Sequence, residues 1–320
     1  MQRIGVLTSG GDSPGMNACL RAVVRKGINL GMEVFGIQRG FQGLIEGDVK
    51  QLYLGSVADI LQRGGTVLKT ARSEEFLTLE GQKKALKVLE EYGIDGLVVI
   101  GGNGSLSGAR DLMNLGYPVI GVPATIDNDL AYTDYTIGFD TAVNTVLDAI
   151  AKIRDTSSSH ERITVIQVMG RNCGDIALFA GLTGGAEVVL VPEYEMEPME
   201  VCEKVKGDFA KGKVHSIIIA AEGYNYSPME LAKLLEKETG KECRPVVLSY
   251  LQRGGAPTMK DRLLATLAGA KAASLLNDDI INKAIGIQDD RITFMDLAEA
   301  LQIEAEFDKD MYDLINVMSK

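Results

Sequence analysis

The stretch from Leu97 to Asp129 reads LVVIGGNGSLSGARDLMNLGYPVIGVPATIDND and contains two short apolar runs, each ending at small, polar or acidic residues. The first run, residues 96–100, is too short for a lone helix and too uniformly apolar for a strand with one wet face. It therefore predicts a strand buried on both faces of a parallel sheet. The second run, residues 118–122, predicts another such strand. Open α/β sheets bind ligands outside the carboxyl ends of their strands.

Glycine-rich and acidic residues follow these two strands. The loop 101–105, Gly-Gly-Asn-Gly-Ser, precedes a helix that we expect to begin near Leu106. Its glycines let the backbone approach a ligand closely, and the N–H groups of a helix start favour an anion such as phosphate. After the second strand, residues 123–129 carry Asp127 and Asp129. The pattern predicts two carboxylates that face a phosphate site.

Length and composition limit the alternatives. A chain of 320 residues exceeds the usual single core, so two lobes are expected. Lys and Arg total 33 against 44 Asp and Glu, a net charge of −11, which gives no overall attraction to nucleic acid or anionic membranes. The four cysteines lack CxxC spacing, and no signal peptide or membrane-length apolar run is present. We therefore expect reduced thiols and a cytoplasmic location.

Strands and helices alternate along the rest of the chain, which predicts an α/β fold with mostly parallel sheets. The first strand, residues 3–8, leads through paired glycines into a helix, as the strand at 96–100 does. Further strands are expected at 34–37, 163–168 and 216–221. Helices are expected at 57–62, 81–92, 141–155 and 261–276.

Several arginines follow glycine turns or share a helix face. Arg72 could bind a phosphate bidentately, although a surface ion pair is the commoner fate of such a residue. Arg21 and Arg25 are spaced i and i+4, so both lie on one helix face, for which a solvated surface is the simplest interpretation. Neither observation decides a function alone.

Common catalytic motifs are absent from the sequence. It has no GxxxxGK[ST] P-loop, and the loop at Gly102 and Gly104 lacks the third glycine of a dinucleotide fingerprint. Only two histidines occur, neither near a nucleophile elbow, and no motif indicates zinc. Phosphate loops, carboxylates and arginines remain, which are the components of phosphoryl transfer. A protein that only binds its ligand is also consistent with these features.

Eight segments carry a resemblance that covers essentially the whole chain. They are LTSGGDSPGMNA at 7–18, TIDND at 125–129 with TIGFDTA behind it, KIRDT with SHER, VMGRNCGD at 168–175, AEG at 221–223 and QRGGAPT at 252–258. In order and spacing the sequence resembles the bacterial ATP-dependent 6-phosphofructokinases. The resemblance implies two Rossmann-like three-layer α/β/α lobes in a homotetramer. The large ATP-binding domain would comprise 1–138 plus 252–305, and the small sugar-phosphate-binding domain 139–251 plus 306–320.

The resemblance also implies roles for individual residues. Asp127 would take the proton from the sugar 1-hydroxyl, with Thr125 and Asp129 beside it and Arg171 steadying the transferring phosphoryl group. Magnesium would be served by Asn103 and Asp129. ATP would contact Gly11, Phe41, Arg72, Ser73, Phe76, Gly102, Asn103, Gly104, Ser105 and Gly108. Fructose 6-phosphate would contact Thr125, Asp127, Asp129, Arg162, Met169, Gly170, Arg171, Glu222, Arg244, Tyr250 and Arg253, with Arg162 and Arg244 supplied by a neighbouring subunit.

An effector pocket for ADP or phosphoenolpyruvate is implied as well, and it changes the interpretation of Arg21 and Arg25. Its residues would be Arg21, Arg25, Asp59, Arg154, Glu187, Lys211, Lys213 and His215.

Three residues depart from the family pattern. Asn103 stands where the family has an aspartate that binds magnesium, so weaker binding of Mg-ATP is expected. Tyr250 replaces a histidine that contacts the sugar phosphate, and a phenol lacks that cationic character. Ala124 replaces a glycine, whereas pyrophosphate-using relatives have a lysine there and an aspartate at the position of Gly104. The sequence thus predicts an active glycolytic kinase or, alternatively, a weakened paralogue that mainly binds nucleotide and effector.

Overall fold

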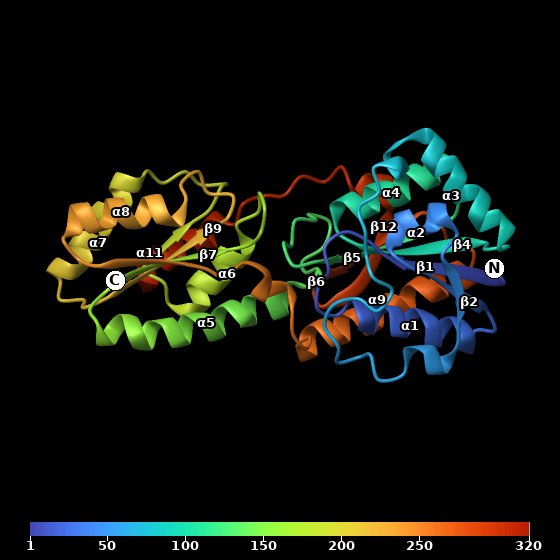
Figure 1. The fold of residues 1–320 in the computed structure, drawn as a ribbon, viewed down its shortest axis with the longest axis horizontal. Helices are drawn as coiled ribbons and strands as arrows, with labels where there is room; N and C mark the ends of the chain where they lie inside the picture. The colour runs from blue at the N-terminus through green and yellow to red at the C-terminus, as the bar shows by residue number, and fades with distance from the viewer. Residues whose placement is uncertain (320) are drawn as a thin grey trace. The chain divides into compact units, whose positions relative to one another are not determined.

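A computed structural model describes residues 1–319, which form two compact units (Figure 1). Unit 1 comprises residues 1–126, 130–141 and 253–305, and unit 2 comprises residues 127–129, 142–252 and 306–319. No helix within residues 1–319 is long and apolar enough to cross a membrane. The four cysteines carry free thiols, as predicted.

Unit 1 is built on one mostly parallel sheet with the strand order β12-β11-β5-β4-β1-β2-β3 and the short β6 beside β5. Its strands are β1 (Arg3–Thr8), β2 (Glu33–Ile37), β3 (Val49–Leu52), β4 (Gly96–Gly101), β5 (Val119–Thr125), β6 (Ile137–Gly138), β11 (Lys283–Gln288) and β12 (Arg291–Asp296). β1, β4 and β5 pair in parallel, whereas β3 and β12 are antiparallel to their neighbours. The strand with two buried faces predicted at 96–100 is therefore confirmed as β4.

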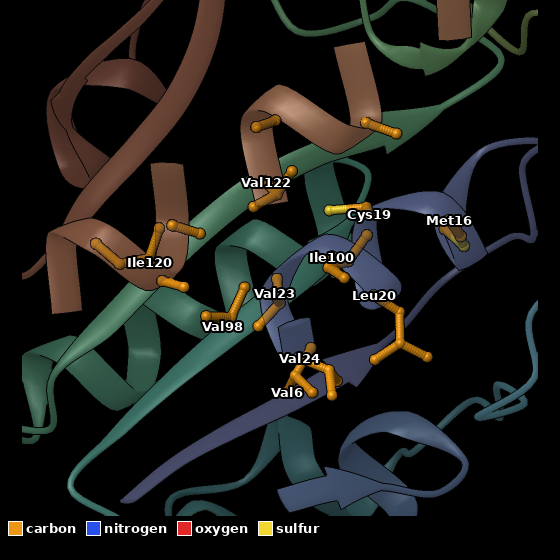
Figure 2. Close-up of a cluster of buried hydrophobic side chains, with 14 of the residues drawn as sticks. Val6, Met16, Cys19, Leu20, Val23, Val24, Val98, Ile100, Ile120 and Val122 are labelled. Atoms are coloured by element: carbon orange, nitrogen blue, oxygen red, sulfur yellow. The ribbon is translucent and has the colours of Figure 1, made fainter. Parts of the chain in front are cut away.

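Helices cover both faces of this sheet (Figure 1). They are α1 (Met16–Asn29), α2 (Gly40–Glu46), α3 (Leu79–Glu91), α4 (Asn103–Asn114), α9 (Met259–Asn277) and α10 (Leu297–Ala300), with 3-10 turns η1 (Leu54–Val57) and η2 (Glu75–Leu77). Alternate residues of β4 enter two separate cores. Val98 and Ile100 pack with α1 and α9, as Figure 2 shows for the α1 side, whereas Leu97 and Val99 pack with α2, α3 and α4. This alternation explains why the β4 sequence is apolar throughout.

Unit 2 contains a smaller, fully parallel sheet with the order β10-β7-β9-β8. Its strands are β7 (Ile163–Val168), β8 (Val188–Leu190), β9 (Ser216–Ala221) and β10 (Cys243–Val247). Its helices are α6 (Asp175–Gly184), α7 (Pro198–Ala210), α8 (Pro228–Thr239) and α11 (Lys309–Met318), with the 3-10 turn η3 (Ser249–Arg253). The long helix α5 (Phe139–Ser159) begins in unit 1 and continues in unit 2.

The helix predicted at 57–62 is wrong. The chain forms η1 at Leu54–Val57 instead, and Asp59 has a left-handed backbone with φ 52°, which a continuing α-helix cannot contain. The antiparallel edge strands β3 and β12, and the strand β11 between β12 and β5, also lay outside the prediction, because their short sequences lack the uniformly apolar pattern of the central strands.

A buried carboxylate anchors the start of α5. Asp261, in the first turn of α9, is 1% exposed and accepts hydrogen bonds from Gly138 N (2.9 Å), Thr141 N (2.8 Å) and Thr141 Oγ1 (2.5 Å). Burial raises the pKa of Asp261, and these hydrogen bonds oppose the rise. The carboxylate therefore satisfies N–H groups that the first turn of α5 leaves unpaired.

Replacing this carboxylate should destabilise unit 1. We expect Asp261→Ala to lower the free energy of unfolding by about 3 kcal/mol, because it leaves buried N–H groups without acceptors. Equilibrium urea unfolding would measure the change. Asp278→Ala, at the exposed opposite end of α9, is the control and should change stability by less than about 0.5 kcal/mol. Equal urea midpoints for the two variants would contradict this role.

Candidate functional site

Three loops of unit 1 meet because β1, β4 and β5 are adjacent parallel strands whose carboxyl ends share one edge of the sheet. The loops after β1 and β4 are in backbone contact. A Cβ on Gly101 would lie 2.5 Å from Ser9 O, so only glycine fits there. Gly10, with φ 84°, needs glycine for its conformation. The paired glycines thus bring the two loops together.

The loop after β4 opens directly into α4, which begins at Asn103 and not near Leu106 as predicted. Gly102 is the N-cap, and no side chain of residues 1–319 caps this helix start. A Cβ on Gly104 would meet nothing within 4 Å. The first-turn N–H groups thus border open space, the arrangement that suits an anionic ligand.

A pocket of about 150 Å³ lies beside this helix start. Its lining residues are Phe41, Ala71, Ser73, Phe76, Leu77, Gly104, Ser107, Gly108 and Asp111. The rings of Phe41 and Phe76 stack with a centroid distance of 4.0 Å, and a Cβ on Gly108 would lie 2.8 Å from the Phe41 ring. The structure therefore gathers Phe41, Ser73, Phe76, Gly104 and Gly108, five of the predicted nucleotide residues, around one aromatic-walled pocket.

Other predicted residues of unit 1 lie near these loops. The Arg253 guanidinium carbon is 3.5 Å from the position of a Cβ on Gly11. Arg72 is exposed, and Ser73 Oγ accepts a hydrogen bond from Phe76 N at 3.3 Å. Thr125 ends β5, and its carbonyl accepts a hydrogen bond from Thr136 Oγ1 at 2.7 Å.

The acidic turn 127–129 belongs to unit 2. Asp127 is 5% exposed, and its Oδ2 lies 3.5 Å from Arg171 Nε. Asp129 Oδ1 is buried without a hydrogen-bond partner among residues 1–319. Burial raises the pKa of Asp129, and the charge of Arg171 opposes part of that rise. Two carboxylates thus lie next to one guanidinium group, which fits proton abstraction and stabilisation of anionic charge.

Side chains from three separate segments hold the loop 169–174, which carries Arg171. Gln252 Oε1 accepts from Met169 N (3.1 Å), Glu222 Oε1 accepts from Arg171 N (2.8 Å) and Glu193 Oε1 accepts from Gly174 N (2.7 Å). Arg171 itself has a left-handed backbone with φ 54°. Backbone contacts add to these bonds, since a Cβ on Gly170 would lie 2.3 Å from Cys173 O.

Sequence reasoning missed two of these three supports. Gln252, which is fully buried, stood within the QRGGAPT segment but carried no predicted role. Glu193 follows β8 without any recognisable motif. Glu222 was predicted to contact sugar phosphate, and the structure shows that one of its oxygens is bonded to the loop.

Arg162 and Arg244 lie away from this loop within the same chain. Both pair with Glu242, Arg162 through Nε at 2.6 Å. Arg162 precedes β7 and Met169 follows it, so the length of a strand, roughly 20 Å, separates them. One small ligand cannot contact both ends of β7. Tyr250 is 73% exposed in η3.

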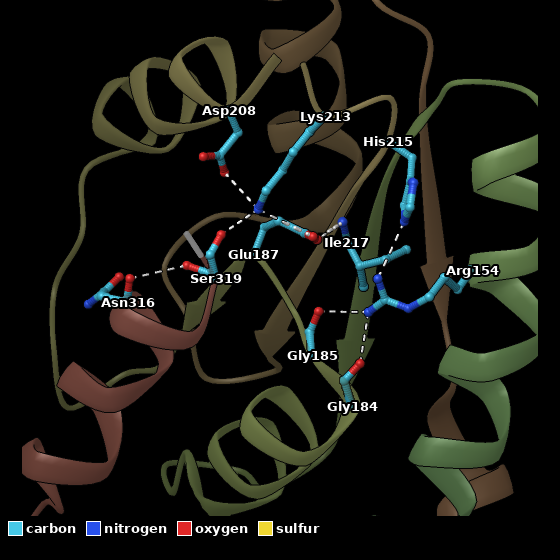
Figure 3. A network of polar contacts seen from close by, with 10 residues as sticks. All are labelled: Arg154, Gly184, Gly185, Glu187, Asp208, Lys213, His215, Ile217, Asn316 and Ser319. Atoms are coloured by element: carbon cyan, nitrogen blue, oxygen red, sulfur yellow. Dashed lines mark hydrogen bonds and ion pairs between the residues drawn. The ribbon is translucent and has the colours of Figure 1, made fainter. Parts of the chain in front are cut away.

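The predicted effector residues divide between the units. Arg21 is half-buried and Arg25 exposed on α1, and Asp59 is exposed, all in unit 1. In unit 2, Figure 3 shows that Arg154 donates to the carbonyls of Gly184 and Gly185 and lies 3.3 Å from His215 Nε2.

Lys213 lies at the centre of a second set of polar contacts in unit 2 (Figure 3). Its Nζ lies 3.6 Å from both Glu187 and Asp208 and donates to Ser319 O at the end of α11. Lys211 is exposed nearby in the sequence. Contacts within the protein therefore already engage Arg154 and Lys213.

Known proteins share this architecture of two α/β units with glycine-rich loops. The phosphofructokinase family model matches residues 3–276. Relatives named ATP-dependent 6-phosphofructokinase are 56% identical in Clostridium tetani, over 319 residues, and 54% identical in Clostridioides difficile, with all of this chain and of each relative covered. The chain belongs to the phosphofructokinase family.

Solved structures agree with this assignment. The phosphofructokinase of Saccharomyces cerevisiae is 34% identical with a TM-score of 0.88, and all of this chain covers 47% of the yeast chain. This chain thus spans about half the length of that structural relative. A pyrophosphate-dependent phosphofructokinase from Marinobacter aquaeolei has a TM-score of 0.87 at 20% identity, with 98% of this chain and 91% of that chain covered. That likeness concerns the fold alone.

Proposed function

We propose that this protein is an ATP-dependent 6-phosphofructokinase, which transfers the γ-phosphoryl group of ATP to the 1-hydroxyl of fructose 6-phosphate and yields fructose 1,6-bisphosphate and ADP. The observation that carries this function is the full-length identity of 54–56% to relatives of that name. The reaction places the protein in glycolysis. A sugar phosphate and ATP as substrates favour a cytoplasmic location.

Asp127 is proposed as the general base. A carboxylate that is nearly buried beside the Arg171 guanidinium can accept the proton of the sugar hydroxyl, while Arg171 stabilises charge on the transferring group. Thr125 and Asp129 flank the base in sequence. The three acceptors that hold the loop 169–174 keep Arg171 in place, so the cation does not have to reorganise during transfer.

Unit 1 is proposed to bind ATP. The aromatic-walled pocket suits an adenine base, and the start of α4 suits the phosphates. The open space at Gly104 favours ATP over pyrophosphate, because a side chain at that position would project where the nucleotide phosphates approach. The proposed contacts are Gly11, Phe41, Arg72, Ser73, Phe76, Gly102, Asn103, Gly104, Ser105 and Gly108.

Magnesium is proposed to accompany ATP. Mg²⁺ is commonly held by one or two carboxylates together with substrate phosphates, and it retains several waters. The buried Oδ1 of Asp129, which has no hydrogen-bond partner within residues 1–319, fits such a ligand, and the Asn103 amide oxygen can accept a bond from a metal-bound water. Within that described part of the chain, no cluster of three or more His, Cys, Asp or Glu residues could hold a metal alone. When bound, the ion would neutralise charge on the phosphates.

The sugar phosphate is proposed to contact Met169, Gly170, Arg171, Glu222, Tyr250 and Arg253 of one subunit and Arg162 and Arg244 of another. The separation of Arg162 from Met169 by the length of β7 supports this division, since one chain cannot bring both to one ligand. Both arginines lie together at Glu242, where they can act as a pair. This arrangement is expected in a homotetramer.

ADP or phosphoenolpyruvate is proposed as an allosteric effector. The supporting feature is the group of basic residues before β9 in unit 2, together with Arg21 and Arg25 on α1. Arg154 and Lys213 are already bonded within the protein, so a phosphate at this site would exchange some of those contacts (Figure 3). That exchange offers a means by which binding could alter the structure.

The first prediction from the proposed function concerns the general base. The weakened paralogue that the sequence left open is not supported by the comparisons. Asp127→Ser should lower kcat roughly a hundredfold or more, because it removes the general base, and should leave ATP affinity nearly unchanged. A coupled assay for fructose 1,6-bisphosphate would measure this. Asp148→Ser, an exposed carboxylate on α5, is the control. Undiminished turnover in Asp127→Ser would refute the assignment of the base.

The second prediction concerns the metal. Asn103→Asp should raise kcat roughly tenfold or more, because a carboxylate at the start of α4 would interact with magnesium more strongly as charge shifts during transfer. Calorimetric titration of Mg-ATP should show a matching change in magnesium dependence. Asn114→Asp places the same charge at the other end of α4 and is the control. An unaltered rate and magnesium titration would mean that Asn103 does not serve the metal.

The third prediction tests the shared site by mixing subunits. Asp127→Ser and Arg162→Ala subunits, each impaired alone, should regain about a quarter of wild-type activity in randomly mixed oligomers, because one of the two sites at each hybrid interface combines intact Asp127 and Arg162. Asp127→Ser mixed with Arg171→Ala is the control, since both changes affect the same chain's residues. If Arg162 acts within its own subunit, neither mixture will regain activity.

A further inference from the structure

The middle residue of the acidic turn 127–129 has an unusual backbone. Asn128 adopts a left-handed conformation with φ 56°, which asparagine tolerates better than most residues but still at some cost. Asp127 and Asp129 flank it, so the directions of both carboxylates depend on this backbone geometry. Something must hold Asn128 in place.

Asp175 makes a side-chain contact with this residue. Asn128 Nδ2 donates a hydrogen bond to Asp175 Oδ2 at 2.8 Å. Asp175 is the first residue of α6. The preceding Gly174 donates its N–H to Glu193, and a Cβ on Gly174 would lie 2.5 Å from the Val191 side chain.

The electrostatic setting makes this contact important. Burial raises the pKa of Asp175, whereas hydrogen bonds from Asn128 and the Cys173 thiol oppose the rise, and the charges of Asp308 and Asp129 add to it. A buried polar group is costly unless it is hydrogen-bonded, and Asn128 supplies such a bond to Asp175. Asn128 and Asp175 therefore stabilise each other.

The loop 169–174 and the first residue of α6 contact the acidic turn at two points. Arg171 lies 3.5 Å from Asp127, and Asp175 bonds Asn128, the next residue. The backbone that carries these two residues is itself held, because Arg171 N donates to Glu222 and Gly174 N, next to Asp175, donates to Glu193. The contact at Asp127 is an ion pair, and the contact at Asn128 is a hydrogen bond that holds the backbone conformation of the turn.

We propose that Asp175 is a positioning residue for phosphoryl transfer, which holds Asn128 in its left-handed conformation and thereby aims the carboxylates of Asp127 and Asp129. This role rests on the proposed function for its effect on catalysis. The simpler alternative is that Asp175 only stabilises the N-terminus of α6, as acidic residues in a first helical turn commonly do.

A charge swap distinguishes the two roles. Asp175→Ala should lower kcat roughly tenfold to a hundredfold through misplacement of the base, with the KM for ATP changed less than about twofold. Asn128→Asp should be more impaired, because it faces two carboxylates toward each other. The double variant N128D/D175N restores one donor and one acceptor. Its kcat should be at least about tenfold higher than that of Asn128→Asp alone. Glu230→Ala, which removes a first-turn acid from α8, is the control.

Hydrogen exchange measured by mass spectrometry gives a readout that does not require activity. In Asp175→Ala, peptides that cover residues 127–129 should exchange faster than in the wild type, and Glu230→Ala should leave them unchanged. A wild-type protein that makes no fructose 1,6-bisphosphate would refute the proposed function, whereas the exchange rates would still decide whether Asp175 holds the turn. Wild-type kcat and unchanged exchange in Asp175→Ala, or no recovery in the swap, would overturn the positioning role.

Discussion

A parallel strand that is covered by helices on both faces can present polar groups only where it ends, and this constraint organises unit 1. β4 sends alternate residues into two cores, so none of its side chains is left for chemistry. The ligand-binding groups must therefore come from the loops beyond Thr8, Gly101 and Thr125. The close contact of Gly101 with Ser9 O then requires glycine at position 101, where the loops after β1 and β4 meet.

Unit 2 is organised differently, because it holds the Arg171 guanidinium on the loop 169–174 and two carboxylates on the turn 127–129. Acidic and amide side chains there act as acceptors for main-chain N–H groups, as Glu193, Glu222 and Gln252 do for the loop 169–174. Such bonds fix the backbone and leave the Arg171 guanidinium to face Asp127.

The central strands and the glycine loops could be predicted from sequence because uniformly apolar runs followed by glycine have few alternatives. The helix start at Asn103 could not, since Gly102 caps it without a side-chain signal. The helix expected at 57–62 failed because the left-handed Asp59 is invisible in a hydrophobic pattern. Glu193 and Asp261 were missed for a related reason, because their partners are backbone N–H groups distant in sequence.

Burial raises the pKa of Asp129, Asp175 and Glu193 alike. A raised folded-state pKa means that each group favours the folded state most at low pH, below its unfolded pKa, and that this contribution is lost as pH rises through the folded pKa. Fixed groups oppose this rise in pKa, namely Arg171 for Asp129, Asn128 for Asp175 and Gly174 N for Glu193. The same groups define the loop geometry. The contacts that offset the electrostatic cost of burying these acids are therefore also the contacts that hold the loop in place.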